Sequence, residues 1–217
     1  MKRLFVFSLL FWGLGSLNAQ NDMRVPLKQG YDNPAVELEG MKIELTRLYV
    51  QSRPWNDQSS HAWLAMTIIT PDEIYETTLY YYEECLLQGN FSRAIGNYLF
   101  NLDVREDSVY LQADTLKFGD IFIFNREEGR SIRIGTLTIT YDSGYMANLV
   151  DENGDYDGYE IGDGLKLSEQ GDEEVVTFLY VSTCGAEDNE STHVWKGYKI
   201  EILDNHNAPL RLRVTKE

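Results

Sequence analysis

The sequence contains few of the residues that most often carry out catalysis. Its 217 residues include three histidines and two cysteines, and they contain no Gly-x-Ser-x-Gly elbow, His-Glu-x-x-His pair or glycine-rich phosphate loop. His61, His193 and His206 fall at the edges of predicted loops or strands, where a surface histidine is the usual case. Carboxylates are so abundant that a glycosidase-like pair arises by chance. We therefore predict that the protein is not an enzyme.

Basic residues are also scarce. The 19 Lys and Arg residues stand against 35 Asp and Glu residues, which gives a formal net charge of −16 at pH 7. A strongly anionic surface repels phosphate backbones and anionic lipid headgroups, so nucleic acid and membrane surfaces are not expected partners. Cations and basic partners are favoured instead.

Long apolar runs are missing, except for residues 4–14. This run follows Lys2 and Arg3 and ends shortly before Ala19, which is the arrangement of a signal peptide. It is too short to span a bilayer, and no stop-transfer segment follows it. Removal of residues 1–19 leaves 17 basic and 35 acidic residues, a charge of −18. Because no cysteine near the cut could carry a lipid, we expect a periplasmic or secreted bacterial protein with no membrane insertion after signal removal.

The two cysteines, Cys85 and Cys184, leave two interpretations open. In an exported protein a pair of cysteines suggests a disulfide. A bridge forms only where the two Cα atoms lie within about 7 Å of each other. The alternative is two buried thiols.

What the sequence does contain is the alternation of apolar and polar residues with period two, which is the pattern of half-buried strands. Turn residues separate the alternating runs, and no long amphipathic helix is predicted. The runs cover residues 36–38, 41–45, 62–69, 98–104, 109–113, 121–124, 132–139, 175–181, 194–203 and 210–214. The predicted fold class is all-β.

Residues 70–82 allow two interpretations. Thr70, Pro71 and Glu73 have the spacing of a helix start, with a capping residue, a proline at the first position and a glutamate three residues after the cap. The β-branched and aromatic residues at 77–78 and 80–82 favour a strand. We predict a turn followed by a strand.

The pattern of residues 75–113 returns in residues 174–214. With Cys184 aligned on Cys85 and two one-residue gaps, residues of the same class fall on one another. Examples are Tyr180 on Tyr81, Tyr198 on Tyr98, Ile200 on Phe100 and Leu212 on Leu111. We interpret the chain as one β unit used twice. The prediction is two tandem immunoglobulin-like β-sandwich repeats, residues 20–116 and 117–217, and the alternative is one large β-sandwich built from a duplicated unit.

An acidic loop, residues 151–164, belongs to the second repeat only. Its first part carries oxygen ligands at alternate positions, and these are Asp151, Asn153, Asp155, Asp157 and Glu160. Calcium prefers six to eight such oxygens, and the loop resembles the Asp-x-Asn-x-Asp calcium loops of secreted proteins. An EF-hand is disfavoured because Tyr156 stands where that motif needs glycine. Calcium is therefore the predicted cofactor, and a solvated acidic turn is the alternative.

Aromatic residues suggest a second site. Trp55 lies in a polar loop, and Trp63, Tyr80 and Tyr82 lie on predicted strands. Together they could form a stacking platform for sugar rings, although outward tyrosines are also common on ordinary strands.

These patterns predict an exported cell-envelope module with a binding or structural role, stabilised by calcium. Its expected partner is a protein or a glycan at the cell envelope. A carbohydrate-binding module is the first alternative, and a glycan-acting enzyme is the second.

Overall fold

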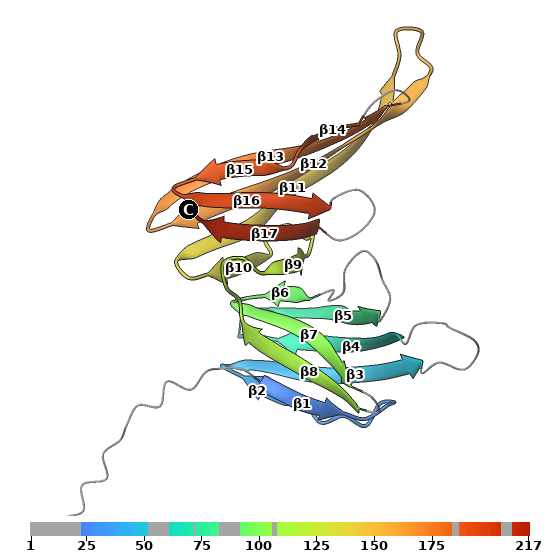
Figure 1. Ribbon diagram of the computed structural model, residues 1–217, viewed down its shortest axis with the longest axis vertical. Coiled ribbons are helices and arrows are strands. Elements are labelled where there is room, and N and C mark those ends of the chain that lie inside the picture. The colour runs from blue at the N-terminus through green and yellow to red at the C-terminus, as the bar shows by residue number, and fades with distance from the viewer. Residues whose placement is uncertain are drawn as a thin grey trace, which may run out of the picture.

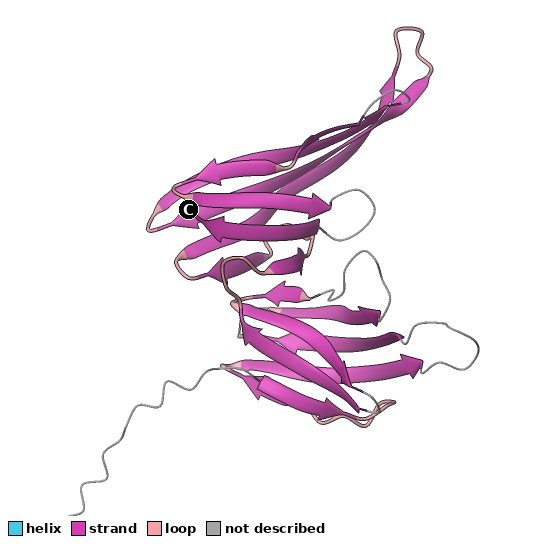
Figure 2. Cartoon of the chain, in the orientation of Figure 1, coloured by secondary structure: helices cyan, strands magenta, loops and turns pink. Residues whose placement is uncertain are grey.

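The structure is a computed structural model that describes residues 23–51, 61–71, 73–82, 92–105, 108–183, 187–204 and 210–217. Every regular element in these residues is a β-strand, so the all-β prediction is confirmed (Figure 2). None of them forms a helix that could cross a membrane. The predicted signal peptide 1–19, Trp55, Cys85, Cys184 and His206 lie outside the described residues.

The described strands divide at residue 116 into a first half and a second half. The strands of the first half are β1 (Met23–Leu27), β2 (Val36–Leu38), β3 (Met41–Gln51), β4 (His61–Ile69), β5 (Ile74–Tyr82), β6 (Arg93–Ile95), β7 (Tyr98–Arg105) and β8 (Ser108–Thr115). Those of the second half are β9 (Ile121–Phe124), β10 (Ser131–Ile134), β11 (Leu137–Val150), β12 (Tyr156–Glu169), β13 (Asp172–Thr183), β14 (Glu187–Glu190), β15 (Thr192–Trp195), β16 (Tyr198–Asp204) and β17 (Leu210–Lys216).

These strands form three sheets. Sheet A has the order β1-β8-β7-β6-β9-β17-β16-β15, sheet B the order β2-β3-β4-β5, and sheet C the order β10-β11-β12-β13-β14. Sheet A runs through both halves, which join where β6 lies parallel to β9 and the Ile123 amide donates to the Ser92 carbonyl at 2.7 Å. Sheet B packs on the first half of sheet A and sheet C on the second half, as two layers (Figure 1).

The strand order is the same in the two halves. In sheet A, β1-β8-β7-β6 corresponds to β9-β17-β16-β15, and β2-β3-β4-β5 corresponds to β10-β11-β12-β13. The immunoglobulin-like order that we predicted is not the one observed. An immunoglobulin sandwich exchanges strands between its sheets, whereas here β2 to β5 form one sheet in chain order and β10 to β14 form another. Short turns between consecutive strands favour this simpler connection.

Each half has its own apolar core, built by the predicted alternation. In the first half Ile43, Leu64, Leu79, Phe100 and Leu111 are fully buried between sheets A and B. The apolar residues buried between sheets A and C include Ile139, Leu165, Phe178, Ile200 and Leu212. Successive strand residues point to opposite faces, so the polar residues between them lie outward.

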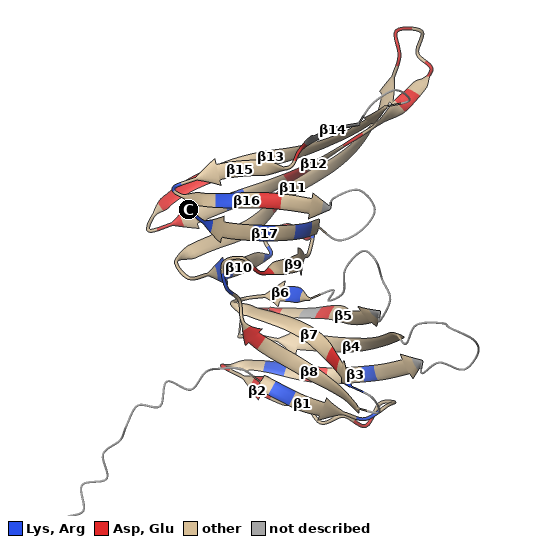
Figure 3. Ribbon diagram, in the orientation of Figure 1, with Lys and Arg blue, Asp and Glu red and all other residues tan. Residues whose placement is uncertain are grey.

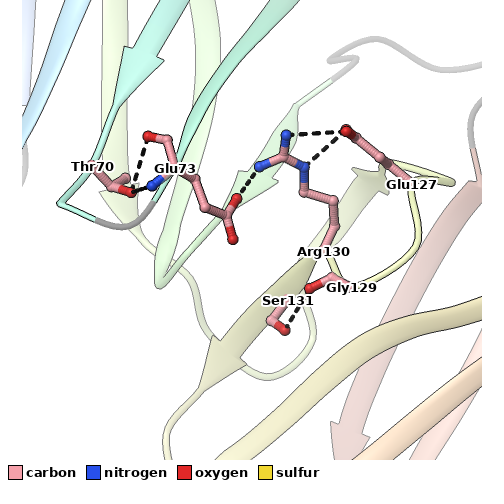
Figure 4. A network of polar contacts seen from close by, with 6 residues as sticks. All are labelled: Thr70, Glu73, Glu127, Gly129, Arg130 and Ser131. Atoms are coloured by element: carbon pink, nitrogen blue, oxygen red, sulfur yellow. Dashed lines mark hydrogen bonds and ion pairs between the residues drawn. The ribbon is translucent and has the colours of Figure 1, made fainter.

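The segment that resembled a helix start forms a turn before β5, as predicted. The Thr70 amide donates to the Glu73 carbonyl at 2.8 Å, and the Glu73 amide donates to Thr70 Oγ1 at 3.0 Å (Figure 4). The Glu73 carboxylate then accepts from the guanidinium of Arg130, whose Nε also donates to Glu127 at 2.8 Å. This hydrogen bond lowers the pKa of Glu127. Arg130 thereby ties the second half to the turn before β5.

Sheet C is longer than sheet B. Strands β11 and β12 have 14 residues each, whereas β3 has 11 and β4 has 9. The extra length carries the hairpin beyond sheet A, where it projects from the body of the molecule (Figure 1). We call residues 143–164 of this hairpin the arm. Its turn carries the predicted acidic loop at the tip (Figure 3).

Candidate ligand-binding surface

The outward face of sheet B carries a row of aromatic side chains. On β4 the residues at even positions are buried, from Ala62 to Ile68, so Trp63 points away from the core. Trp63 lies opposite Tyr49 of β3 and opposite Tyr80 of β5. We call these three residues the aromatic row.

A β-bulge brings Tyr49 into this row. The pairing of β3 with β4 shifts by one residue between Leu45 and Arg47, so Thr46 is the extra residue. Leu45 and Leu48 both face the core, which is possible only because the bulge changes the parity of the strand. Tyr49 therefore faces outward, whereas an unbroken alternation from Leu45 would have turned it inward.

The aromatic row is closely packed. The rings of Tyr49 and Trp63 are stacked, with centroids 5.7 Å apart and planes at 22°. His61 lies diagonally across, 6.2 Å from the Tyr49 ring. The guanidinium of Arg47 lies 5.3 Å from the Trp63 ring and 5.1 Å from the Tyr31 ring. Tyr31 is 64% exposed and Tyr80 is 39% exposed, so the row ends in one accessible ring, Tyr80, and a second accessible ring, Tyr31, lies beside Arg47.

A shallow depression of about 200 Å³ lies beside the aromatic row. On β4 and β5, Ala65 and Thr78 come next to Trp63 and Tyr80 on the same face, and the small alanine leaves space there. The depression is lined by Thr46, Ala65, Met66, Thr67, Glu76, Thr77 and Thr78. The buried Thr77 Oγ1 has no hydrogen-bond partner among the described residues. The surface thus combines flat rings with hydroxyl and carboxylate groups.

The structure places the predicted sugar-binding residues as follows. Trp63 and Tyr80 lie side by side in the aromatic row, and the Tyr82 backbone pairs with His61 in the next row. Trp55 lies outside the described residues. The sequence analysis missed Tyr49, Arg47 and Tyr31. The only signal for Tyr49 was the pair of inward leucines at positions 45 and 48, whose odd spacing requires a bulge.

Of the predicted acidic loop 151–164, only residues 151–155 form a turn, at the tip of the arm, whereas residues 156–164 belong to strand β12. Asp151 Oδ1 accepts from the amides of Asn153 and Asp155 at 2.8 and 2.9 Å, and its Oδ2 accepts from Asn153 Nδ2 at 3.1 Å. These hydrogen bonds, first of all the one from the Asp155 amide, lower the pKa of Asp151. The carboxylate therefore closes the turn with its own backbone, as aspartate does in many turns.

The other predicted calcium ligands do not converge with Asp151. Asp157 is the extra residue of a second bulge in β12, and Glu160 accepts from the Tyr145 hydroxyl farther along the arm. No group of three or more His, Cys, Asp or Glu residues in the described parts of the chain is placed to hold a metal ion. The residues do not fit a calcium ion as they are arranged, and calcium binding stays a prediction that requires the turn to rearrange.

A buried ion pair lies at the root of the arm. Asp163 is 1% exposed, and Arg126 donates to its Oδ1 from Nε and to its Oδ2 from Nη2, both at 2.8 Å. The Tyr141 hydroxyl donates to Asp163 Oδ1 at 3.0 Å. Burial, together with the Asp163 charge, raises the pKa of Tyr141 to about 12.

An open pocket of about 540 Å³ borders this ion pair. Both oxygens of Asp163 are already bonded to Arg126, which suits a structural ion pair better than a catalytic acid. The aromatic row is therefore the stronger candidate for ligand binding.

Comparison with protein-family models, with curated proteins and with solved structures found no match for the chain.

Proposed function

We propose that the protein is a non-enzymatic binding module of the bacterial cell envelope, and that the aromatic row binds sugar rings of a glycan. Tyr80, which is 39% exposed, offers an accessible ring to the C–H side of a sugar ring, next to the half-buried rings of Tyr49 and Trp63. The threonines and Glu76 beside it offer hydrogen-bond partners for sugar hydroxyls. The export signal predicted for residues 1–19 agrees with a periplasmic or extracellular glycan.

The observation that carries this proposal is the alignment of Tyr49, Trp63 and Tyr80 across three adjacent strands. Neighbouring strands lie about 4.8 Å apart, so three rings in a row span about 10 Å. This is the scale of two linked sugar rings. A rigid sheet holds the rings in place, so binding orders few side chains.

A structural role is the second candidate, and Arg47 favours it. Its guanidinium lies near both Tyr31 and Trp63, and such cation–π contacts stabilise a sheet surface without any ligand. Cross-strand aromatic pairs do the same. In this case the row would hold sheet B together in an envelope protein that binds its protein partner elsewhere.

We further propose that the two halves are tandem copies of one β-sandwich unit. Two observations support this proposal. Both halves have the same strand order, and β3 and β11 carry a bulge at the same place, at Thr46 and Asp142. Internal repeats of this kind arise when one supersecondary unit is duplicated.

The test is a binding titration with soluble oligosaccharides, chosen by a first screen on a glycan array. Trp63→Ala should weaken binding roughly two- to tenfold, because stacking on one aromatic ring contributes about 0.5 to 1.5 kcal/mol. Tyr49→Ala should weaken it by a smaller factor. Circular dichroism of each variant confirms that it is folded.

Tyr145 provides a matched control because it occupies the place in the arm that Tyr49 occupies in sheet B. Tyr145→Ala should leave glycan binding unchanged. If no glycan binds, or if Trp63→Ala binds as well as the unmodified protein, the sugar-binding proposal is wrong. A loss of stability in Trp63→Ala without any glycan binding would support the structural role.

A further inference from the structure

The arm exposes one edge of its hairpin. Residues 143–150 of β11 pair with β12 on one side. On the other side β10 pairs with β11 only at residues 137–140, and the last backbone hydrogen bonds to that edge are those of Tyr141. Among the described residues, no strand pairs with the outer edge of residues 143–150, which we call the open edge.

The open edge carries no charge. Its sequence is Ser-Gly-Tyr-Met-Ala-Asn-Leu-Val in a chain of which 25% is charged. Tyr145, Met146 and Val150 are 47%, 67% and 63% exposed. By contrast, the strand at the opposite edge of the arm, β14, reads Glu-Asp-Asn-Glu. Proteins usually protect exposed edges with charges, proline or a covering segment, because an unprotected edge pairs with other strands.

The first half covers the corresponding edge with its own chain. The Gly30 amide donates to the Leu48 carbonyl and the Leu48 amide donates to the Gly30 carbonyl, both at 2.9 Å. Leu48 lies two residues after the bulge of β3, which is the place that Gly144 has in β11. In the second half the backbone pairing ends at Tyr141 instead. The same edge is therefore covered by an extended segment in one half and left open in the other.

We propose that a second copy of this chain covers the open edge, with the two arms paired antiparallel. An antiparallel pair of identical edges is a closed two-fold contact, so it stops at a dimer. Because the arm projects from the body, this pairing places the two bodies at opposite ends (Figure 1). The exposed Met146 and Val150 of each copy come to lie beside uncharged residues of the other.

The charge of the protein decides how this contact depends on salt. Each copy has a net charge of −16, so the two bodies repel each other. A paired edge of eight residues spans about 27 Å, which is several times the screening length of about 8 Å at physiological salt. The repulsion is therefore weak at physiological salt and grows as salt is removed, so the dimer should weaken below physiological salt and strengthen as salt is restored. Binding of a basic peptide strand to the same edge would instead weaken as salt is added.

The contact is small for a dimer interface, so we expect it to form in the micromolar range and not below it. Sedimentation equilibrium of the protein between about 1 and 200 µM tests this. The expected result is a monomer at the low end and a dimer at the high end. The double variant Met146→Lys/Asn148→Lys, which places like charges across the paired edges, should weaken the dimer at least tenfold.

The control is Val175→Lys/Thr177→Lys, which adds the same two charges at the same spacing on exposed positions of β13 in the same sheet. This variant should dimerise like the unmodified protein. Amide hydrogen exchange adds a measurement that needs no variant, because residues 143–150 should become protected as the concentration rises while residues 44–51 do not change.

Three results would overturn the proposal. The first is a monomer at the highest concentration, and the second is a dimer that the Met146→Lys/Asn148→Lys variant forms equally well. The third is a monomer whose residues 143–150 become protected only when a lysine-rich extended peptide is added, which would assign the edge to a different occupant.

Discussion

Sheets B and C each have an outward row of three residues at the same place in the two halves. The two rows differ in the number of aromatic rings that they carry. In sheet B, Tyr49 stacks on Trp63, and Tyr80 completes the row. In sheet C the corresponding residues are Tyr145, Gly162 and Leu179. A Cβ atom added to Gly162 would lie 2.2 Å from Cε1 of Tyr145, so the tyrosine ring lies directly over the glycine. The same bulge therefore supports a platform of rings in one half and a single flat ring in the other.

The core-facing residues next to these outward rows also differ, because they are apolar in sheet B and partly polar in sheet C. Leu48, Leu64 and Leu79 fill the first half, whereas the second half has Gly144, Asp163 and Phe178. Gly144 leaves room for the Tyr141 hydroxyl, which would lie 2.0 Å from an added Cβ atom. A buried leucine has thus been exchanged for a buried carboxylate that needs Arg126 and Tyr141 as partners. The comparison shows that one backbone arrangement accepts either an apolar row or a polar one, provided that each buried charge is paired.

The largest effect is expected at the inward row. Asp163→Ala should lower the free energy of unfolding by about 3 kcal/mol, because it removes the buried carboxylate to which both Arg126 and the Tyr141 hydroxyl donate. Urea denaturation measures this change.

The double variant Arg126→Leu/Asp163→Leu makes the second half resemble the first. It should recover most of the lost stability, since replacing both partners of a buried pair by apolar residues is often close to neutral. If the double variant is as unstable as Asp163→Ala, the ion pair stabilises the fold more than apolar side chains do at the same positions.

A smaller effect is expected at the outward row of the arm. Gly162→Ala should destabilise the protein by about 1 kcal/mol, because the added methyl group displaces the Tyr145 ring and breaks its hydrogen bond to Glu160. The measurement is thermal unfolding followed by circular dichroism. In a Tyr145→Ala background the same substitution should instead stabilise by about 0.5 kcal/mol, because alanine costs less than glycine in a strand. Equal effects in both backgrounds would contradict the ring-over-glycine arrangement.

A third comparison concerns the outer face of sheet A. Asn101 lies opposite Gln112 in the first half, and Glu201 lies opposite Arg213 at the corresponding place in the second half. The Glu201 carboxylate accepts a hydrogen bond from Arg213 at 2.8 Å and another from Lys199 at 2.7 Å. These hydrogen bonds lower the pKa of Glu201 to about 2.

This pKa shift predicts a pH dependence. The unfolded carboxyl group titrates near 4.5 and the folded one near 2, so the stabilisation is present above pH 4.5 and is lost as the pH falls towards 2. Glu201→Gln should therefore lower the stability by roughly 1 kcal/mol at pH 7 and by much less at pH 2. Asn101→Ala, measured by the same urea titrations, should show no such dependence between these pH values.

The smallest effect is expected at the tip of the arm. Asp151→Ala should lower the melting temperature slightly in calcium-free buffer, because the carboxylate holds the turn through backbone amides. The melting temperature then tests calcium. A rise with millimolar calcium in the unmodified protein that is absent in Asp151→Ala would support the predicted metal site.

The alternation of residues along the strands determined most of the fold class in advance. It predicted the strands around Phe100 and Ile200 and the strand that follows Pro71, because the side of a strand on which a residue lies is set by its immediate neighbours. Tyr80 was recognised as an outward residue for the same reason, whereas residues 62–69 are apolar at both even and odd positions and did not reveal on which side Trp63 lies. The absence of long apolar runs after residue 14 and the excess of acidic residues were likewise evident from composition alone.

Tertiary structure decided the rest. The bulge at Thr46 reverses the parity of β3 and turns Tyr49 outward, and sheet A joins halves that the sequence suggested were separate. The pairing of Arg126 with Asp163 links residues 37 positions apart along the chain. Each of these features depends on which strands lie beside one another, and a pattern with a period of two residues carries no information about that.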